Sequence, residues 1–190
     1  MSPSKSSSHR RNYNEPGHAH ELTWSCYKRF QFLKTDRVCQ WLAGSIAVAR
    51  VEFNFDVWAY VSMPEHLHLI IRPRSKVYDI ADIRQALKAP VASSAIEYLE
   101  REAPSWLPRI SRLRAGNTER LFWQPGGGFD RNITEPSTLF KMIDYAHLNP
   151  VRRGLVIDPA DWKWSSAGWF LRMEGGPIPL DPIPPEWANA

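Results

Sequence analysis

The segment FNFDVWAYVSMPEHLHLIIRP, residues 53–73, contains the strongest signals for the fold. Apolar and polar side chains alternate over residues 53–63, which predicts a strand with one apolar face. Pro64 indicates a tight turn, and residues 65–72 predict a second strand that pairs with the first as a hairpin. The apolar face of the first strand is expected to carry Phe53, Phe55, Val57, Ala59, Val61 and Met63. The opposite face is expected to carry Asn54, Asp56, Trp58, Tyr60 and Ser62.

The segments on either side of this hairpin predict further strands and helices. Apolar residues recur at helical spacing after Asp36, and residues 79–89 show a second helical pattern. Pro90 starts or kinks a continuation of the second helix to about Glu102. The other predicted elements are a strand over residues 20–27, a basic loop over 109–120, and a strand or ribbon over 121–133 that Gly126, Gly127 and Gly128 interrupt.

The last predicted helix carries an aromatic residue on its polar side. Thr134 is expected to cap this helix, which ends near Asn149 because Pro150 disfavours the helical state in the residue before it. On a wheel of about 100° per residue, Tyr145 lies nearly opposite the apolar stripe and beside Lys141 and Asn149. The apolar stripe consists of Leu139, Phe140, Ile143, Ala146 and His147.

The predicted order of elements is strand, helix, strand, strand, helix, strand, helix. This order predicts an α+β fold, a ferredoxin-like sandwich with a mostly antiparallel sheet, helices on one face and a C-terminal helix that bears the tyrosine. Residues 1–12 are Ser-rich and basic and are expected to form a disordered arm. Residues 13–172 are expected to form one domain, and residues 173–190 a Pro-rich, extended tail.

Composition and charge indicate the kind of partner and the cellular compartment to expect. The formal net charge of +4 favours a polyanionic partner. The two cysteines, Cys26 and Cys39, form no CxxC pair, which argues against a disulfide framework or a cysteine zinc site and fits a reducing compartment. No apolar run approaches the roughly 20 residues that span a bilayer, and residues 1–11 lack the apolar core of a signal peptide. A cytoplasmic protein without membrane contact is expected.

A pair of histidines on the second strand of the hairpin could bind a metal ion. His66 and His68 point to the same side of the strand, away from the main core, about 6.6–6.8 Å apart along the backbone. Imidazole suits Mn, Fe, Co, Ni, Cu or Zn, whereas Mg²⁺ prefers oxygen ligands. The alternative is that both rings only form hydrogen bonds with neighbours. A second pair, His18 and His20, is a rival site, a DNA contact, or neither.

The tyrosine on the last helix is a possible nucleophile. A phenol has an ordinary pKa of about 10, so Tyr145 needs help at neutral pH, such as a metal ion that polarises the target phosphate. Attack on phosphorus would give a phosphotyrosine that a later hydroxyl can reverse, which is the chemistry of enzymes that cut and rejoin DNA. Asn149 could offer a carbonyl oxygen to the same ion. The alternative is an amphipathic tyrosine at a helix end.

Two segments resemble one known family. VSMPEHLHLIIRP, residues 61–73, and FWQPGGGFDRNITEPSTLFKMIDYAHLNPVRRGLV, residues 122–156, resemble the signature segments of REP-associated tyrosine transposases, within the single-tyrosine HUH transposase superfamily. The resemblance implies a ferredoxin-like fold, hairpin-containing single-stranded DNA as substrate, Mg²⁺ or Mn²⁺, and a 5′-phosphotyrosine with a free 3′-hydroxyl. It also implies that His66, His68 and Asn149 bind the metal and that Tyr145 is the nucleophile.

The chain departs from the family pattern in two places. Ala146 occupies a position where relatives have a larger aliphatic side chain, which is a change in packing. Residues 17–22, GHAHEL, differ from the Gly-Thr-x-Tyr run of relatives, which bears on the recognition of a guide sequence rather than on catalysis.

Binding of single-stranded DNA requires cations along the phosphates and rings that stack on bases, at about 1–3 kcal/mol for each stacked base. The predicted phosphate contacts are Arg72, Lys141, Arg131, Arg152 and Arg153. The predicted stacking rings are Trp58, Tyr60 and Trp123.

The leading hypothesis is a DNA transposase, a metal-dependent endonuclease and ligase for hairpin-containing single-stranded DNA. The alternative is a domesticated single-stranded DNA-binding protein without turnover. A third hypothesis is a small hydrolase that uses His66, His68 and a metal-bound water. The sequence leaves open whether the protein is a monomer or a homodimer, and whether Tyr145 meets the metal within one chain or across two.

Overall fold

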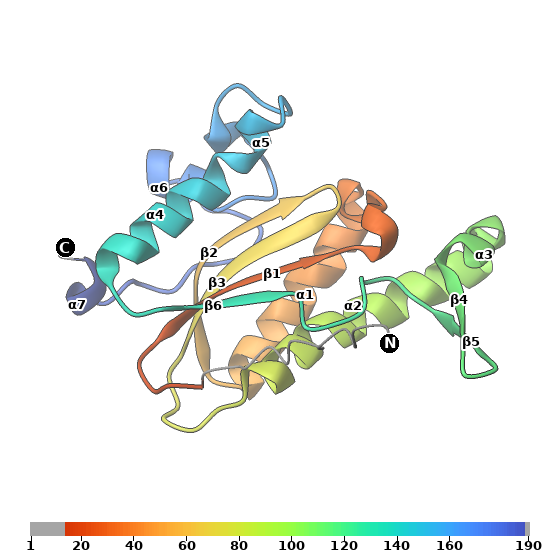
Figure 1. Ribbon diagram of the computed structural model, residues 1–190. Coiled ribbons are helices and arrows are strands. Elements are labelled where there is room, and N and C mark those ends of the chain that lie inside the picture. The colour runs from red at the N-terminus through yellow and green to blue at the C-terminus, as the bar shows by residue number, and fades with distance from the viewer. Residues whose placement is uncertain (1–13, 189–190) are drawn as a thin grey trace, which may run out of the picture.

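A computed structural model describes residues 14–188 of the chain. A four-stranded antiparallel sheet with the order β2-β3-β1-β6 forms the centre, and helices cover both of its faces (Figure 1). The strands of this sheet are β1 (Ala19–Ser25), β2 (Phe55–Met63), β3 (His66–Pro73) and β6 (Phe129–Ile133). The main helices are α1 (Asp36–Glu52), α2 (Ile80–Glu102) and α4 (Pro136–His147). The predicted α+β class and ferredoxin-like order are confirmed, and the predicted arm over residues 1–12 lies outside the described residues.

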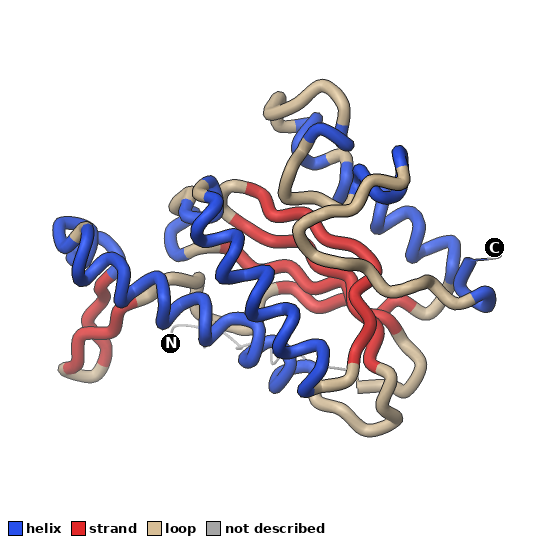
Figure 2. The backbone as a smooth tube through the Cα atoms, turned by 180° about the vertical axis from the view of Figure 1, so that it is seen from behind, coloured by secondary structure: helices blue, strands red, loops and turns tan. Residues whose placement is uncertain are grey.

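Helices α1 and α2 cover one face of the sheet (Figure 2). Each helix buries a stripe of apolar side chains at helical spacing, and full burial of one such side chain contributes about 1.5–3 kcal/mol. The buried residues of the two stripes include Val38, Leu42, Ile46, Ala49, Ile80, Ile83, Leu87 and Val91. The sheet residues in the same core include Leu22, Trp24, Leu67, Leu69 and Ile71. This is the main core of the protein.

Helix α2 continues through Pro90, as predicted, and a contact with α1 compensates for the proline. A proline has no amide hydrogen to donate to the carbonyl group four residues earlier, which here belongs to Ala86. The hydroxyl of Ser45 in α1 donates instead, at 3.2 Å from the carbonyl oxygen of Ala86 and 2.9 Å from that of Leu87. The neighbouring helix therefore supplies the hydrogen bond that the proline removes.

Helix α4 lies on the opposite face of the sheet, the face that carries the histidines. Leu139 and Ile143 pack there with Ala19, Trp58, Ala59, Ile70 and Ile133. Glu135, rather than the predicted Thr134, is the N-cap residue, because its backbone is extended and Pro136 is the first helical residue. Helix α4 ends at His147, and the single turn of α5 (Asn149–Arg152) follows.

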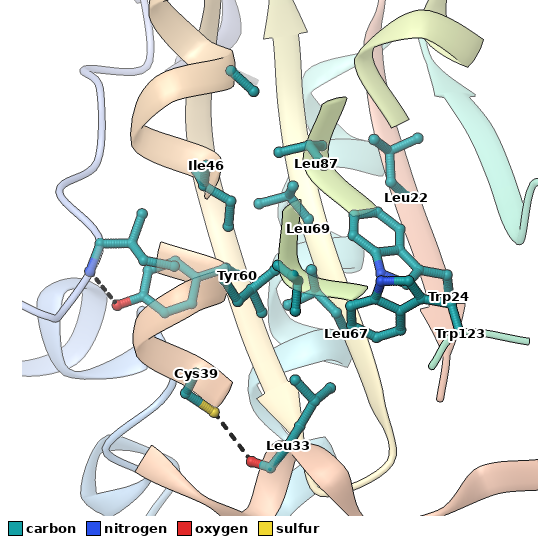
Figure 3. Close-up of a cluster of buried hydrophobic side chains, with 14 of the residues drawn as sticks. Leu22, Trp24, Leu33, Cys39, Ile46, Tyr60, Leu67, Leu69, Leu87 and Trp123 are labelled. Carbon is teal, nitrogen blue, oxygen red and sulfur yellow. Dashed lines mark hydrogen bonds between the residues drawn. The ribbon is translucent and has the colours of Figure 1, made fainter. Parts of the chain in front are cut away.

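Strand β2 differs from the prediction because its pairing with β3 shifts by one residue at Trp58. Val57 pairs with Ile71, and Ala59 pairs with Ile70. One extra residue in a strand reverses which side chains face each side of the sheet. Tyr60 therefore points into the main core, where its hydroxyl accepts a hydrogen bond from the amide of Ile178 (Figure 3). The predicted single apolar face, with Tyr60 on the histidine face, is wrong. The first two residues of that prediction, Phe53 and Asn54, precede the strand.

The predicted basic loop over residues 109–120 is wrong, because most of it is a hairpin that projects beyond the sheet (Figure 1). Arg112 forms an ion pair with Glu119 across the hairpin, and Ala115 and Gly116 have the positive φ angles of a tight turn. The elements of this arm are α3 (Leu107–Ile110), β4 (Ser111–Arg114) and β5 (Asn117–Arg120).

The predicted ribbon over 121–133 is regular only in β6. The remaining helical turns are η1 (Tyr27–Arg29), η2 (Phe32–Lys34), η3 (Pro104–Trp106), η4 (Pro159–Asp161), α6 (Ala167–Arg172) and α7 (Pro185–Ala188).

The predicted C-terminal tail packs against the domain as far as residue 188. Trp187 in α7 is buried and contacts the ring of Trp58 at a centroid distance of 5.3 Å. The carboxylate of Asp181 accepts a hydrogen bond of 2.8 Å from the amide of Val57. The Pro-rich segment has no helix or strand before α7, and these contacts hold it against the domain. Within residues 14–188, no helix combines the length and apolar character needed to cross a membrane.

Candidate metal and tyrosine site

The histidine pair lies at the start of β3, on the face of the sheet opposite to the main core, as predicted. The Nε2 atoms of His66 and His68 are 3.1 Å apart, and their ring centroids are 4.9 Å apart. Both residues are buried, with exposed fractions of 9% and 7%. Both rings therefore direct their Nε2 atoms toward one point that is shielded from solvent.

Side chains on neighbouring segments anchor the other nitrogen of each ring. The Nδ1 atom of His66 lies 3.3 Å from Oε1 of Glu65. The Nδ1 atom of His68 lies 3.1 Å from the hydroxyl oxygen of Thr23 and 3.7 Å from Oε1 of Glu21. Metal-binding histidines in proteins commonly have such partners, which fix the tautomer and the direction of the ring. The Nε2 atom of each ring is thus available to donate a lone pair to a metal ion.

The chemistry of this donor pair fits a divalent cation. A separation of 3.1 Å between the Nε2 atoms is about that of two adjacent ligands of one ion with bonds of about 2.1 Å. Burial, together with the adjacent imidazole of His68, lowers the pKa of His66 to about 4, so this ring is neutral at pH 7. In residues 14–188, no three side chains among His, Cys, Asp and Glu are grouped to hold a metal. A third ligand would have to be an amide, a water or a phosphate oxygen.

Glu65 is buried next to His66 and binds two arginines. Oε1 of Glu65 is 2.7 Å from Nη1 of Arg153 and 3.6 Å from Nη2 of Arg29. Burial by itself raises the pKa of a carboxyl group, but the hydrogen bond from Arg153 and the nearby His66 hold the pKa of Glu65 below its usual value. Glu65 is therefore a carboxylate at neutral pH.

The structure brings Tyr145 to the histidines within a single chain. The rings of Tyr145 and His68 meet edge to face at a centroid distance of 6.1 Å. Tyr145 is 47% exposed, in the last turn of α4, as expected for a residue off the apolar stripe. A cavity of about 350 Å³ has walls from α4 and from the strands, and it is lined by Glu21, Thr23, His68, Phe129, Arg131, Met142 and Tyr145.

Asn149 and Arg152 bind the end of the helix that carries Tyr145. The side-chain amide of Asn149 donates to the carbonyl oxygens of Tyr145 and Ala146, at 2.9 Å and 3.2 Å. Its own carbonyl oxygen takes no part in these bonds. The guanidinium of Arg152 lies 4.9 Å from the centre of the Tyr145 ring and donates to the Tyr145 carbonyl oxygen at 3.3 Å. The role of Asn149 as a metal ligand stays a prediction.

The predicted phosphate contacts divide into two groups. Arg131 lines the cavity beside Tyr145, and Arg152 and Arg153 contact Tyr145 and Glu65. Arg72 lies about 13 Å along β3 from His68, by the rise per residue, and its guanidinium is 3.9 Å from Glu186.

Lys141 is exposed on α4, one turn before Tyr145. Arg72 lies at the other end of β3 from the histidine pair, and the position of Lys141 relative to the pair stays a prediction.

The three predicted stacking rings are core residues. Trp58, Tyr60 and Trp123 are only 0%, 1% and 6% exposed. Trp123 packs with Trp24, as Figure 3 shows, and its indole donates to the carbonyl oxygen of Lys88 at 2.9 Å. None of the three rings has a face on which a base could stack, so this prediction is wrong. The shift in β2 explains Tyr60, and packing against Trp187 explains Trp58.

The second histidine pair does not form a rival site. His20 faces the main core side of the sheet and is fully buried. Its Nδ1 lies 2.9 Å from Asp130, and its Nε2 lies 2.7 Å from the hydroxyl of Tyr78. His18 is 3.1 Å from the side-chain amide of Asn132. Both ring nitrogens of His20 are therefore engaged in hydrogen bonds within the protein.

Three residues of the site were not predicted from the sequence: Glu21, Thr23 and Glu65. Glu21 and Thr23 are two positions apart on β1, so alternation places their side chains on one face. That signal is present in the sequence, but Thr23 matters only because β1 pairs with β3 and sets it opposite His68. The sheet order, which no local pattern reveals, decides this contact.

No protein-family model matches the chain, and no curated protein matches it. A solved structure of a REP-associated tyrosine transposase bound to a REP hairpin is similar, with 21% sequence identity, a TM-score of 0.68, and coverage of 94% of each chain. A second solved structure, of a protein described as a transposase from Deinococcus radiodurans R1, has 21% identity and a TM-score of 0.44 over 72% of this chain and 94% of that one. The first of these comparisons shows that the chain has the fold of a REP-associated tyrosine transposase.

Proposed function

We propose that this protein is a transposase that cleaves and rejoins hairpin-containing single-stranded DNA. Tyr145 is the nucleophile, and His66 and His68 bind a divalent metal ion. The observation that carries the proposal is the approach of the Tyr145 ring to His68, whose Nε2 faces that of His66 at 3.1 Å. A phenol and two metal-binding nitrogens then act on one phosphate group.

The cleavage step exchanges one phosphate ester for another. The phenol oxygen of Tyr145 forms a bond to phosphorus, and the bond from phosphorus to the 3′ oxygen breaks. The phenol proton passes to solvent, and the 3′ oxygen takes up a proton and leaves as a hydroxyl. The product is a 5′-phosphotyrosine, and attack by a 3′-hydroxyl restores the DNA without nucleotide consumption. The cavity beside Tyr145 is the space in which the phosphate would lie.

His66, His68 and the side-chain oxygen of Asn149 would hold Mg²⁺ or Mn²⁺. Two imidazole ligands favour Mn²⁺ over Mg²⁺. When bound, the ion raises the electrophilicity of the phosphate and stabilises charge in the transition state. Arg131, in the cavity wall, and Arg152, beside the tyrosine ring, would bind the neighbouring phosphates.

The proposed substrate is a DNA hairpin flanked by a single strand. Two observations support it: the REP-associated transposase of the same fold is bound to a REP hairpin, and the net charge of this chain is +4. The absence of exposed rings among the three predicted stacking residues favours recognition through phosphates and hydrogen bonds.

Covalent trapping tests the proposal. The wild-type protein, incubated with a labelled hairpin oligonucleotide and Mn²⁺, should form a protein–DNA adduct that survives denaturing electrophoresis. Tyr145→Phe should abolish the adduct. Tyr98→Phe, in α2 on the other face of the sheet, is the matched control and should leave the adduct unchanged.

Other outcomes identify the competing hypotheses. Tight hairpin binding without an adduct and without an effect of Mn²⁺ would indicate a DNA-binding protein without turnover. Cleavage that persists in Tyr145→Phe would indicate a hydrolase that uses a metal-bound water. Either result would show that Tyr145 is not the nucleophile.

A further inference from the structure

The carboxylate of Glu65 touches three separate parts of the structure at one oxygen. Glu65 lies in the turn between β2 and β3, and only 4% of the residue is exposed. Its Oε1 lies 3.3 Å from Nδ1 of His66, 2.7 Å from Nη1 of Arg153, and 3.6 Å from Nη2 of Arg29. Within the described residues, its Oε2 is buried without a hydrogen-bond partner. A carboxylate in such a place is costly unless its neighbours compensate.

The contact with Arg153 crosses the site. Arg153 follows α5 directly and therefore continues the chain that carries Tyr145 and Asn149. Its guanidinium donates to Glu65 in the turn before His66, so one hydrogen bond joins the segment that follows the tyrosine helix and α5 to the turn that precedes the histidine strand. Arg153 was predicted as a phosphate contact, but here a protein carboxylate already binds it.

The contact with Arg29 depends on an unfavourable backbone. Lys28 and Arg29 are consecutive residues with φ angles of 50° and 56°, in the left-handed region that residues other than glycine rarely adopt. Such strain persists only where surrounding contacts impose it, and it is frequent near functional sites. The turn brings the Arg29 side chain toward the same carboxylate.

The fold alone does not require this arrangement. The side chains of Arg153 and Arg29 are 46% and 67% exposed, and ion pairs with exposed cations add little to stability. A carboxylate can only accept hydrogen bonds. Next to Glu65, Nδ1 of His66 must therefore carry the hydrogen. His66 must then present Nε2 as a lone pair toward His68.

We propose that Glu65 is a positioning residue that links the two halves of the site. It orients His66 for metal binding, and through Arg153 it holds the end of the tyrosine helix against the histidine strand. This role rests on the proposed function, because it assumes that His66 and His68 bind a divalent cation and that Tyr145 acts beside them. Arg153 is accordingly a structural bridge and not a phosphate contact.

Mn²⁺ affinity, measured without DNA, tests the first part of the role. Free Mn²⁺ is quantified by electron paramagnetic resonance during titration of the wild-type protein and of Glu65→Gln. The amide keeps the shape of the side chain but removes the charge and can present a donor to Nδ1. We expect a loss of Mn²⁺ affinity of about 10-fold to 100-fold, the range found for partners of metal-binding histidines. Glu97→Gln, exposed on α2, is the matched control and should bind Mn²⁺ like the wild type.

The distance between Tyr145 and the ion tests the second part. The protein is labelled with 3-fluorotyrosine, and the fluorine resonance of residue 145 is assigned by its loss in Tyr145→Phe. In the wild type, bound Mn²⁺ should broaden this resonance strongly. In Arg153→Met at equal Mn²⁺ occupancy, the broadening should be clearly weaker, and Arg153→Lys should restore part of it. Arg114→Met, on the projecting hairpin, is the matched control and should behave like the wild type.

Three results would overturn the proposal. Equal Mn²⁺ affinity of Glu65→Gln and the wild type would show that Glu65 does not position His66. Unchanged broadening of the Tyr145 resonance in Arg153→Met would show that the bridge does not hold the helix. A wild-type protein without Mn²⁺ affinity would remove the metal site and the positioning role together. None of these measurements uses DNA, so a failure to cleave hairpins would count against the proposed function alone.

Discussion

The ring of Tyr145, at the end of α4, meets the ring of His68, on β3, edge to face at a centroid distance of 6.1 Å. The approach arises because α4 packs across the sheet face that carries the histidines, with Leu139 and Ile143 buried against it. Tyr145 and His68 therefore line one cavity within a single chain, and the Nε2 atom of His66 lies 3.1 Å from that of His68.

Thr23→Val should weaken metal binding. The hydroxyl of Thr23 lies 3.1 Å from Nδ1 of His68, and valine has the same shape without a hydrogen-bonding group. Loss of such a partner lowers metal affinity by about tenfold or more. Isothermal titration with Mn²⁺ measures the change, and Thr118→Val, exposed on β5, is the matched control. Equal affinity in Thr23→Val and the wild type would show that Thr23 does not orient His68.

Arg131→Ala should weaken binding of hairpin DNA and reduce its dependence on salt. Arg131 lines the cavity beside Tyr145, where a phosphate would release a counterion on binding. Removal of one phosphate contact reduces the slope of log K against log salt by about 1. Filter binding at several salt concentrations measures the slope. Arg114→Ala, which removes an exposed arginine from the projecting hairpin, should leave the slope unchanged. A slope that falls equally in both variants would place the DNA elsewhere.

His147 should make the protein less stable in mild acid. Burial lowers the pKa of His147 to about 4, whereas an unfolded histidine has a pKa near 6.5. Between these values the unfolded chain takes up a proton and the folded chain does not. The free energy of unfolding should therefore fall as the pH drops from about 6.5 to about 4, by about 1.4 kcal/mol per pH unit.

Urea unfolding of the wild type and of His147→Gln at several pH values isolates this contribution. Glutamine can keep a hydrogen bond to Ser166, which lies 2.8 Å from Nε2 of His147. The difference between the two proteins should be larger at pH 7 than at pH 4.5. A difference that does not change with pH would contradict the prediction, while His66, which is present in both proteins, cancels.

Trp187→Ala should destabilise the domain by about 3–5 kcal/mol, the usual cost of removing a buried aromatic side chain. Trp187 is 7% exposed and packs on the fully buried Trp58, so its loss leaves a cavity between α7 and the sheet. Trp169→Ala, at a site that is 37% exposed, should cost clearly less. Chemical denaturation measures both, and equal costs would show that α7 is not part of the core.

The sequence by itself was sufficient for the elements with a clear period. Alternation predicted the strand that carries His66 and His68, and the wheel of the last helix placed Tyr145 off its apolar stripe, as the exposed fraction of 47% bears out. These predictions succeed because each depends on the spacing of residues within one segment, which backbone geometry translates directly into a face. The chemical types of the candidate site atoms, two imidazole nitrogens and one phenol oxygen, also follow from the sequence alone.

Only the tertiary structure decided which segments meet. The sheet order sets Thr23 opposite His68, and the shift at Trp58 turns Tyr60 into the main core. Glu65 binds Arg153, which follows α5, the turn after the tyrosine helix. The physical reason is that strand neighbours, bulges and ion pairs depend on contacts between residues distant in the chain, and no local period specifies such contacts.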